Sequence, residues 1–421
     1  MLLIIFARLN GGLTMNIREL RNMFPALSRT VYGKQLVYFD NAATAQRSQS
    51  VIDKWTQLTI GANANIHRAV HKLAVDATDE YESTRDAVKE YINAAAREEI
   101  VFTSGTTGSI NLVAFSFGEA FVNEGDEIIV SEAEHHSDIV PWQMLCQRKG
   151  AVLRVLHVDE DGHLNLEELK SLLNPKTRIV AVTQISNVLG ILNPVKEIVS
   201  ICHSAGCPVL IDGAQGMVHE GVDVQDVDCD FYVFSGHKLY AATGTGVLYG
   251  KRKWLDQMVP YQGGGEMIAT VRFSGTTYAP LPEKFEAGTQ NINAIPTLEP
   301  AIEMLKLMKD KELLNAQEAV SQYLFHALTS NPRIRLYGVP RGTETKIPLF
   351  SFSVEGAHHE DLALILDKMG IAVRSGQMCA EPLMDRFGVT GMLRASLAPY
   401  NTMDEAEYFI KSLDKAIAML V

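Results

Sequence analysis

The sequence predicts an α/β protein whose mostly parallel sheet is covered by helices on both faces, joined to a smaller α+β domain. Three observations support this prediction. Short runs of strand-forming residues alternate with helical patterns through the middle of the chain. These runs contain almost only apolar residues, as in strands that are buried on both faces. Beyond residue 330 the order of elements changes. A length of 421 residues allows two or three domains.

The composition is that of a soluble, acidic globular protein. Lys and Arg total 38 against 50 for Asp and Glu, which gives a net charge of -12, and 47% of residues are hydrophobic. No basic stripe is present, so we expect no nucleic-acid partner. The five cysteines include no C-x-x-C pair, which argues against a disulfide framework or a zinc site. We therefore expect no metal and a reducing, cytoplasmic location.

The first 14 residues contain a short apolar run but no features of a targeting segment. The run is too short to span a membrane, and no charged region precedes it as in a signal peptide. Because Met15 begins a more typical N-terminus, we expect residues 1–14 to be a disordered extension and no membrane association. We predict that 15–30 join the small domain, that 31–300 form the large domain and that 301–421 complete the small one.

In chain order, a strand at 36–39 leads into small residues that include Ala43, which either let a ligand approach the backbone or form a simple turn. An amphipathic helix follows at 73–93. A strand at 99–102 then precedes a turn with Thr106 and Thr107 and a new helix. This order places N–H groups and hydroxyls at a helix N-terminus, where they bind phosphate or simply cap the helix.

The middle of the chain alternates strands and helices. Strands are predicted at 127–130, 152–156, 178–183, 209–211, 231–234 and 247–249, with helices at 140–149, 166–173 and 195–205. A glycine-rich loop and hairpin follow residue 261, and helical patterns occupy 294–328. The small domain reads as strand 348–354, helix 360–369, strands 371–374 and 393–397, and helix 403–419.

Three reactive side chains follow predicted strands, at the edge where open α/β sheets bind ligands. Lys238 comes just after the strand at 231–234, and a partly desolvated lysine forms Schiff bases. Asp212 ends the strand at 209–211 and could cap a helix or pair with a protonated pyridine nitrogen. His135 follows the strand at 127–130 and could stack on a flat ring, although adjacent histidines are more often solvated loop residues. Together with the Thr106 turn, these groups match the requirements of pyridoxal phosphate.

Five motifs in family order resemble the group II, SUF-type cysteine desulfurases, members of the class V family of fold-type I pyridoxal phosphate enzymes. The resemblance extends from about residue 16 to the C-terminus. The motifs are TSGTT at 103–107, EHHSDIVPW at 134–142, IDGAQ at 211–215, FYVFSGHK at 231–238 and RSGQMC at 374–379.

The resemblance implies a role for each site residue. Lys238 would form the Schiff base with pyridoxal 5'-phosphate and move protons with His135, which would stack on the ring. Asp212 would face the pyridine nitrogen and Gln215 the phenolic oxygen. The residues expected around the phosphate are Thr106, Thr107, Ser235 and His237, joined by Thr289 from the second subunit of a homodimer with shared sites. The residues expected around the substrate are Asn187, Arg394, Arg374, His67 and Ala43.

Cys379 decides the reaction that the resemblance implies. A free cysteine is usually an inert buried residue, but Arg374 nearby and a loop setting favour an exposed, partly ionised thiol. The implied reaction converts L-cysteine to L-alanine, leaves a persulfide on Cys379 and supplies sulfur, through a small acceptor protein, for iron–sulfur cluster assembly. Gln377 and Met378 occupy positions at which many members of the family carry histidines. Gly108 occupies the position after the Thr-Thr pair, at which family members often carry Glu.

Two alternatives remain open from sequence. A selenocysteine lyase or a cysteine/cystine lyase of the same class would share the fold and the cofactor, since these do not define the substrate. A non-catalytic partner in a sulfur-transfer complex would keep the fold alone, although the presence of both Lys238 and Cys379 argues against it.

Overall fold

The computed structural model describes residues 15–341 and 346–421, so the expected extension at 1–14 lies outside the described residues. Its largest sheet has seven strands in the order β4-β10-β9-β8-β7-β5-β6. Strands β5 to β9 run parallel, and only β10 is antiparallel to its neighbours β9 and β4. The predicted mostly parallel sheet is confirmed. Its strands are β4 (Ile100–Thr103), β5 (Glu127–Ser131), β6 (Val152–Leu156), β7 (Thr177–Thr183), β8 (Val209–Asp212), β9 (Phe231–Ser235) and β10 (Gly246–Gly250).

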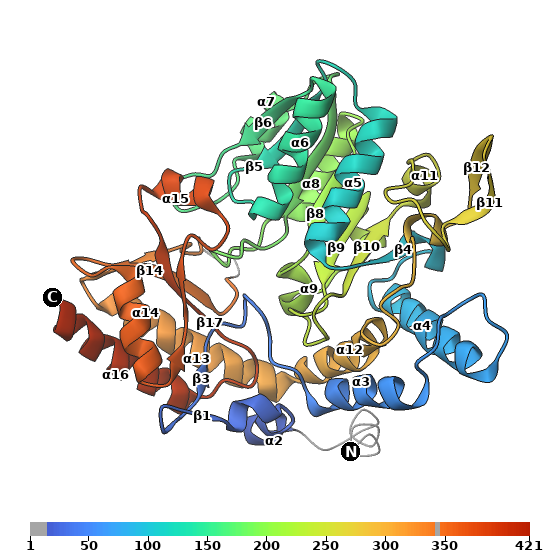
Figure 1. Ribbon diagram of the computed structural model, residues 1–421. Helices are drawn as coiled ribbons and strands as arrows, with labels where there is room; N and C mark the ends of the chain where they lie inside the picture. The colour runs from blue at the N-terminus through green and yellow to red at the C-terminus, as the bar shows by residue number, and fades with distance from the viewer. Residues whose placement is uncertain (1–14, 342–345) are drawn as a thin grey trace.

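Helices cover both faces of this sheet (Figure 1). Neighbouring residues of β8 belong to different hydrophobic cores. Ile211 lies in the core on the α8 face of the sheet, whereas Leu210 lies in the core on the α5 and α6 face. This explains why the strands are apolar throughout, because a sheet buried on both faces has no polar side. The helices of this part are α5 (Thr106–Phe121), α6 (Val140–Lys149), α7 (Leu166–Leu172), α8 (Val195–Ser204), α9 (Gly216–His219), α10 (Val224–Val227) and α11 (Arg252–Leu255).

The remaining long helices form a layer below the sheet in Figure 1 and connect it to the C-terminal part. They are α3 (Gln49–Gly61), α4 (Lys72–Tyr91), α12 (Leu298–Met308) and α13 (Lys311–Ser330). The helical patterns predicted at 294–328 therefore correspond to two helices, α12 and α13. The break comes at Asp310, whose side chain accepts a hydrogen bond from the Glu312 N–H and caps α13.

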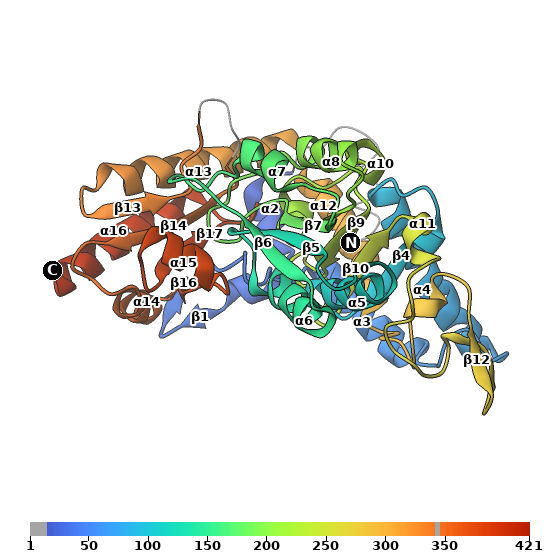
Figure 2. The same cartoon turned by 90° about the horizontal axis from the view of Figure 1, so that it is seen from above.

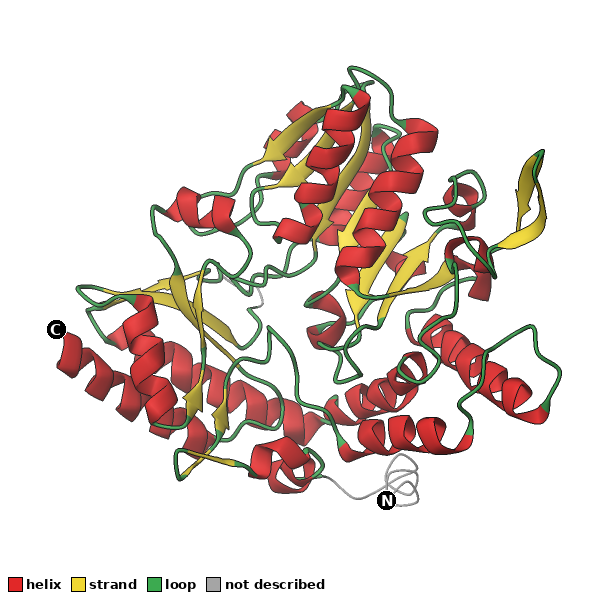
Figure 3. Ribbon diagram, in the orientation of Figure 1, coloured by secondary structure: helices red, strands yellow, loops and turns green. Residues whose placement is uncertain are grey.

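The C-terminal part contains a four-stranded antiparallel sheet in the order β13-β14-β17-β16, with helices against it (Figure 3). The single strand predicted at 371–374 is in fact two strands in different sheets. Ile371–Ala372 pairs with the N-terminal strand, whereas Arg374–Gly376 pairs with β17. The elements are β13 (Ile334–Tyr337), β14 (Leu349–Val354), β15 (Ile371–Ala372), β16 (Arg374–Gly376), β17 (Met392–Ser396), α14 (His359–Lys368), α15 (Glu381–Phe387) and α16 (Met403–Leu420).

The N-terminal segment packs with this C-terminal part. Strand β3 pairs in parallel with β15, and Val37 and Phe39 are buried in the same core as Phe352 and Leu413. Residues 37–39 thus pack with the C-terminal part, whereas Leu20, Phe24 and Leu27 belong to the core of the main sheet, and the boundary at residue 30 stays a prediction. The N-terminal elements are α2 (Ile17–Asn22), β1 (Thr30–Val31), β2 (Lys34–Gln35) and β3 (Val37–Tyr38).

A two-stranded hairpin extends away from the body of the molecule, as both Figure 1 and Figure 2 show. It consists of β11 (Ile268–Arg272) and β12 (Gly275–Tyr278), and Phe273 at its tip is fully exposed. The predicted glycine-rich loop and hairpin after residue 261 is confirmed. Short 3-10 helices complete the fold at Pro25–Ser28, Arg97–Glu99, His136–Asp138, Glu283–Phe285 and Ile295–Thr297. Among the described residues, no helix has the length and apolar character needed to span a membrane.

A buried ion pair holds the segment after the hairpin. Glu286 accepts hydrogen bonds from Arg85 Nη1 at 2.7 Å and Nη2 at 2.9 Å, from the Phe102 N–H at 2.7 Å and from the Tyr81 hydroxyl at 3.1 Å. The Arg85 side chain is fully buried, and its guanidinium lies 4.5 Å from the centre of the Phe102 ring. Residues 286–289 therefore have a fixed anchor on α4 and β4.

We predict that Glu286→Ala lowers the free energy of unfolding by about 3–5 kcal/mol, because it leaves the Arg85 charge buried with only the partly exposed Glu82 beside it. Denaturant unfolding of the purified variant measures this loss. Glu303→Ala is the matched control, since it removes only an exposed ion pair with Lys306. Equal stability of the two variants would contradict the prediction.

Candidate functional site

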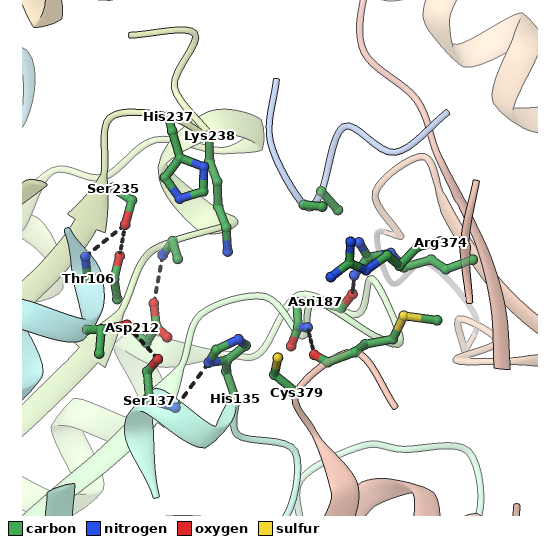
Figure 4. A pocket seen from close by; sticks show the side chains of 16 residues that line it. Thr106, His135, Ser137, Asn187, Asp212, Ser235, His237, Lys238, Arg374 and Cys379 are labelled. Carbon is green, nitrogen blue, oxygen red and sulfur yellow. Dashed lines mark hydrogen bonds between the residues drawn. The ribbon is translucent and has the colours of Figure 1, made fainter. Parts of the chain in front are cut away.

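A pocket of about 190 Å³ lies where the carboxyl ends of the main-sheet strands face the C-terminal sheet. Figure 4 shows that Lys238 reaches into it from the main sheet, whereas Cys379 and Arg374 come from the C-terminal part. The structure brings twelve of the predicted residues together as its lining: Ala43, Thr106, Thr107, His135, Asn187, Asp212, Ser235, His237, Lys238, Arg374, Cys379 and Arg394.

One side of the pocket is built on the N-terminus of α5. Gly105 precedes this helix at φ 146°, a conformation that L side chains rarely adopt, and its backbone lies against Gly246 of β10. The Ser235 hydroxyl accepts a hydrogen bond from the Thr106 N–H at 2.7 Å and lies 2.7 Å from the Thr106 hydroxyl. Gly105 has no side chain to cap the helix, and Ser235 takes only the Thr106 N–H, so within the described residues other backbone N–H groups of the first turn are left for an anion.

The floor of the pocket holds a carboxylate and an amine. Asp212, at the end of β8, is buried, and burial raises its pKa even though one of its oxygens accepts a hydrogen bond from the Ala214 N–H at 2.8 Å. Burial lowers the pKa of Lys238, and the positive charge of Arg394 lowers it further. Within the described residues the Lys238 amine makes no hydrogen bond. A larger share of this amine is therefore neutral than in an exposed lysine.

His135 lies at the start of the 3-10 helix after β5. Its Nδ1 accepts a hydrogen bond from the Ser137 N–H at 3.0 Å, so the neutral ring carries its proton on Nε2. Burial lowers the pKa of His135 to about 4, with contributions from the charges of Lys238, His136 and Arg394. The ring is therefore neutral at pH 7, with a donor nitrogen.

The opposite wall is cationic. Arg394 of β17 is buried, donates a hydrogen bond from Nη1 to the Asn187 carbonyl at 2.7 Å and lies 3.3 Å from an Asp40 oxygen. Its Nε is buried and has no partner among the described residues. Arg374 is exposed and lies 3.8 Å from the same carboxylate. Two guanidinium groups thus share one carboxylate, which leaves net positive charge for an anionic substrate group.

Cys379 is the one exposed cysteine among the five, all of which are free. The other four are buried, and burial raises the pKa of each, to about 12 in Cys202. Met378 and Cys379 both have positive φ angles, 55° and 56°, so the backbone at the thiol holds a conformation that is unfavourable for non-glycine residues. Of the cysteines, only this one can react with a molecule in the pocket.

Three predicted residues do not line the pocket of this single chain. Gln215 is buried and its Nε2 donates to the Ala42 carbonyl at 2.8 Å. His67 pairs through Nε2 with Glu82 at 3.1 Å, and this interaction raises the pKa of the imidazole. Thr289 is exposed and lines a separate pocket beside Gly108 and Glu286.

Sequence reasoning missed a pair of buried acids beneath His135. Glu134 Oε1 accepts a hydrogen bond from the Thr183 N–H at 2.9 Å, and Asp138 Oδ1 accepts one from the Trp142 indole at 2.8 Å. Their other oxygens are buried without a donor in the described part of the chain, and the two carboxyl groups lie within hydrogen-bonding range of each other. Burial and the neighbouring negative charge raise the pKa of both groups, so the pair shares a proton. Ser137 was also missed. The only signal in the sequence was the spacing of the acids within the EHHSD motif.

The comparisons with known proteins agree over nearly the whole chain. The aminotransferase class-V family matches residues 37–409. A protein named cysteine desulfurase from Cronobacter sakazakii is 44% identical over 402 residues, which is 95% of this chain and 98% of that protein. A second protein of that name, from Shigella sonnei, is 45% identical over 409 residues, or 97% of this chain and 100% of its own length.

Solved structures give the same result. The crystal structure of the cysteine desulfurase CsdA from Escherichia coli superimposes with a TM-score of 0.89 at 39% identity and covers 97% of this chain and 100% of that one. The apo structure of a cysteine desulfurase from Thermococcus onnurineus gives 0.90 at 34% identity, again with 97% and 100% covered.

The shared proton beneath His135 predicts a pH-dependent stability. The folded pair keeps a bound proton, whereas the same carboxyl groups in the unfolded chain release their protons above about pH 4. The stability that this proton contributes is therefore full below about pH 4 and is lost as the pH rises through the raised pKa of the pair. Asp138→Asn supplies an amide donor in place of that proton. We expect its free energy of unfolding to fall less than that of the wild type between pH 5 and pH 8, by up to about 1.4 kcal/mol per pH unit.

Urea unfolding at several pH values, with both proteins in the same ligand state, measures this difference. Asp226→Asn serves as the control because the Asp226 carboxylate is exposed and pairs only with Lys196. A wild type and an Asp138→Asn variant with the same pH slope would show that the pair holds no extra proton.

Proposed function

Since the chain belongs to the aminotransferase class-V family, we propose that it is a pyridoxal phosphate-dependent cysteine desulfurase that converts L-cysteine to L-alanine and leaves a persulfide on Cys379. The observation that supports this most strongly is the combination, in one pocket, of a partly desolvated lysine and an exposed cysteine. As in the SUF-type enzymes that the motifs resemble, the persulfide sulfur would serve iron–sulfur cluster assembly.

The residues present fit the cofactor. The cradle of Gly105 and Gly246 would be filled by a Cβ at either position, and beside it Thr106, Thr107, Ser235 and His237 offer donors for a phosphate. The buried carboxylate of Asp212 has only one hydrogen bond and suits a protonated ring nitrogen. When bound, pyridoxal phosphate withdraws electron density from the Cα atom of an amino acid.

Lys238 and His135 have the proton states that this chemistry needs. A neutral Lys238 amine would hold the cofactor through its aldehyde group, and the same Nζ could take a proton from Cα of the substrate. Neutral His135 carries its proton on Nε2, with which it can donate a hydrogen bond to a developing negative charge.

Arg394 is the group best suited to hold the substrate carboxylate. The guanidinium group of Arg394 is held by its hydrogen bond to the Asn187 carbonyl and by Asp40. Its buried Nε has no partner among the described residues and remains able to donate. Arg374 adds a second, exposed cation at the mouth. Together they would hold the substrate carboxylate on the same side of the pocket as Cys379.

The net reaction balances with Cys379 as the acceptor of sulfur. The thiolate attacks the substrate sulfur, an S–S bond forms, the carbon–sulfur bond of the substrate breaks, and protons convert the three-carbon fragment to alanine. Gln377 and Met378, the two residues before the thiol, offer no base at this position.

We also propose a homodimer and a small sulfur-acceptor protein as partners. Thr289 is exposed on a loop anchored by Glu286, which suits delivery of its hydroxyl to the pocket of a second subunit. The Gln215 side chain donates a hydrogen bond to the Ala42 carbonyl. It would reach the phenolic oxygen of the cofactor by exchanging this hydrogen bond for one to that oxygen.

The test of this function compares L-cysteine with L-selenocysteine as substrates. We expect wild-type protein to form alanine from L-cysteine, and Cys379→Ala to lose this activity because no thiol accepts the sulfur. Alanine quantified after each turnover assay provides the measurement. A Cys379→Ala variant with full activity on L-cysteine would contradict the proposal, and one that is fully active only on selenocysteine would favour the lyase.

Arg394→Lys is expected to raise the KM for L-cysteine about tenfold or more, because lysine keeps the charge beside Asp40 but loses the planar fork. Steady-state kinetics give the KM, and the thermal unfolding midpoint shows whether the variant is folded. Arg335→Lys, on the exposed strand β13, is the control. An unchanged KM would exclude Arg394 from carboxylate binding.

A further inference from the structure

The backbone around Cys379 is tied to the large domain by three hydrogen bonds, at Met378, Cys379 and Glu381. The Asn187 Nδ2 donates to the Met378 carbonyl at 2.9 Å. The His136 N–H donates to the Cys379 carbonyl at 2.7 Å. The Glu381 N–H donates to His136 Nε2 at 3.0 Å. Two of the three ties therefore come from one residue, the neighbour of His135.

The tie through the His136 side chain replaces a missing helix cap. Glu381 is the first residue of α15, and the preceding Ala380 has no side-chain oxygen with which to cap it. The next residue, Pro382, has no N–H at all. Without His136, the Glu381 N–H has no protein partner within the described residues, and the first turn of α15 is unsupported.

These ties matter because the loop is held in an unfavourable conformation. Met378 and Cys379 both occupy the left-handed region, which is unfavourable for non-glycine residues. Met378 and Ala380 are buried on either side, so a loop fixed at both flanks presents the Cys379 side chain outward. Such a conformation persists only where surrounding contacts determine it.

We propose that His136 is a positioning residue for the nucleophile: it clamps the backbone at the Cys379 carbonyl and at the Glu381 N–H to the segment that carries His135. The inference rests on the proposed function for its catalytic consequence, but the clamp itself is a property of the fold. One short segment then places the ring-stacking His135 and the attacking thiol at a fixed separation. The sequence offered no sign of this, since it presents His136 only as the second of two adjacent histidines.

The clamp requires a hydrogen-bond acceptor at the position of Nε2. Because Nε2 accepts from Glu381, the neutral ring carries its proton on Nδ1. In His136→Gln the side-chain oxygen can occupy the place of Nε2, whereas the shorter amide of His136→Asn reaches only the place of Nδ1. These two variants have the same functional group and differ in reach, so each is the control for the other.

Two readouts test the proposal. Hydrogen–deuterium exchange of peptides spanning residues 376–387, without substrate, reports the clamp directly. The rate of persulfide formation on Cys379 at saturating L-cysteine, together with the KM, reports its effect on the reaction. For His136→Asn we expect faster exchange in this segment, a persulfide rate about fivefold lower, as expected for one lost hydrogen bond, and an unchanged KM. His136→Gln should match the wild type in all three.

Either of two results would overturn the proposal. If both variants behave as the wild type does, the Nε2 bond does not position the thiol. If both lose exchange protection and rate equally, the imidazole acts in some way other than as an acceptor of the Glu381 N–H. A wild type that forms no persulfide would contradict the proposed function, while the exchange measurement would still decide the clamp. Thermal unfolding of each variant confirms that it is folded.

Discussion

The candidate site depends on the contact between two sheets of different topology. Parallel strands end together at one edge of the main sheet, which gathers Asp212, Lys238 and the His135 segment. The C-terminal sheet meets this edge, and Arg394 bridges the two parts by its hydrogen bond to the Asn187 carbonyl. Neither part has a complete set of reactive groups, because the lysine belongs to one and Cys379 to the other. The contact between the main sheet and the C-terminal sheet therefore brings the reactive groups together in one site.

Burial of charge at this contact sets the proton states. The same desolvation that raises the pKa of Asp212 lowers that of Lys238, which leaves a lysine able to act as a base. Beneath them, Glu134 and Asp138 avoid a second buried negative charge by sharing a proton. The pocket thus suits a ligand that carries a ring cation and several anionic oxygens, because not all charged groups of the protein at this contact are paired with each other.

The sequence predicted the strands of the main sheet from apolar runs, which are local signals, and the resemblance of the motifs supplied most of the pocket residues. It did not predict α3 or β13. It could not predict pairings between distant segments. The split of 371–374 into two sheets depends on where Val37 pairs, and the position of His67 depends on Glu82. The proton shared by Glu134 and Asp138 likewise requires three-dimensional proximity.

The central claim is that Cys379 receives sulfur from L-cysteine in a reaction that needs Lys238. The most direct measurement is mass mapping of Cys379-containing peptides after brief treatment with L-cysteine in the absence of reductant. The account predicts an added sulfur atom on the Cys379 peptide of the wild type and none in Lys238→Ala. Formation of alanine with an unmodified Cys379 would contradict it, since the sulfur would then leave the site by another route.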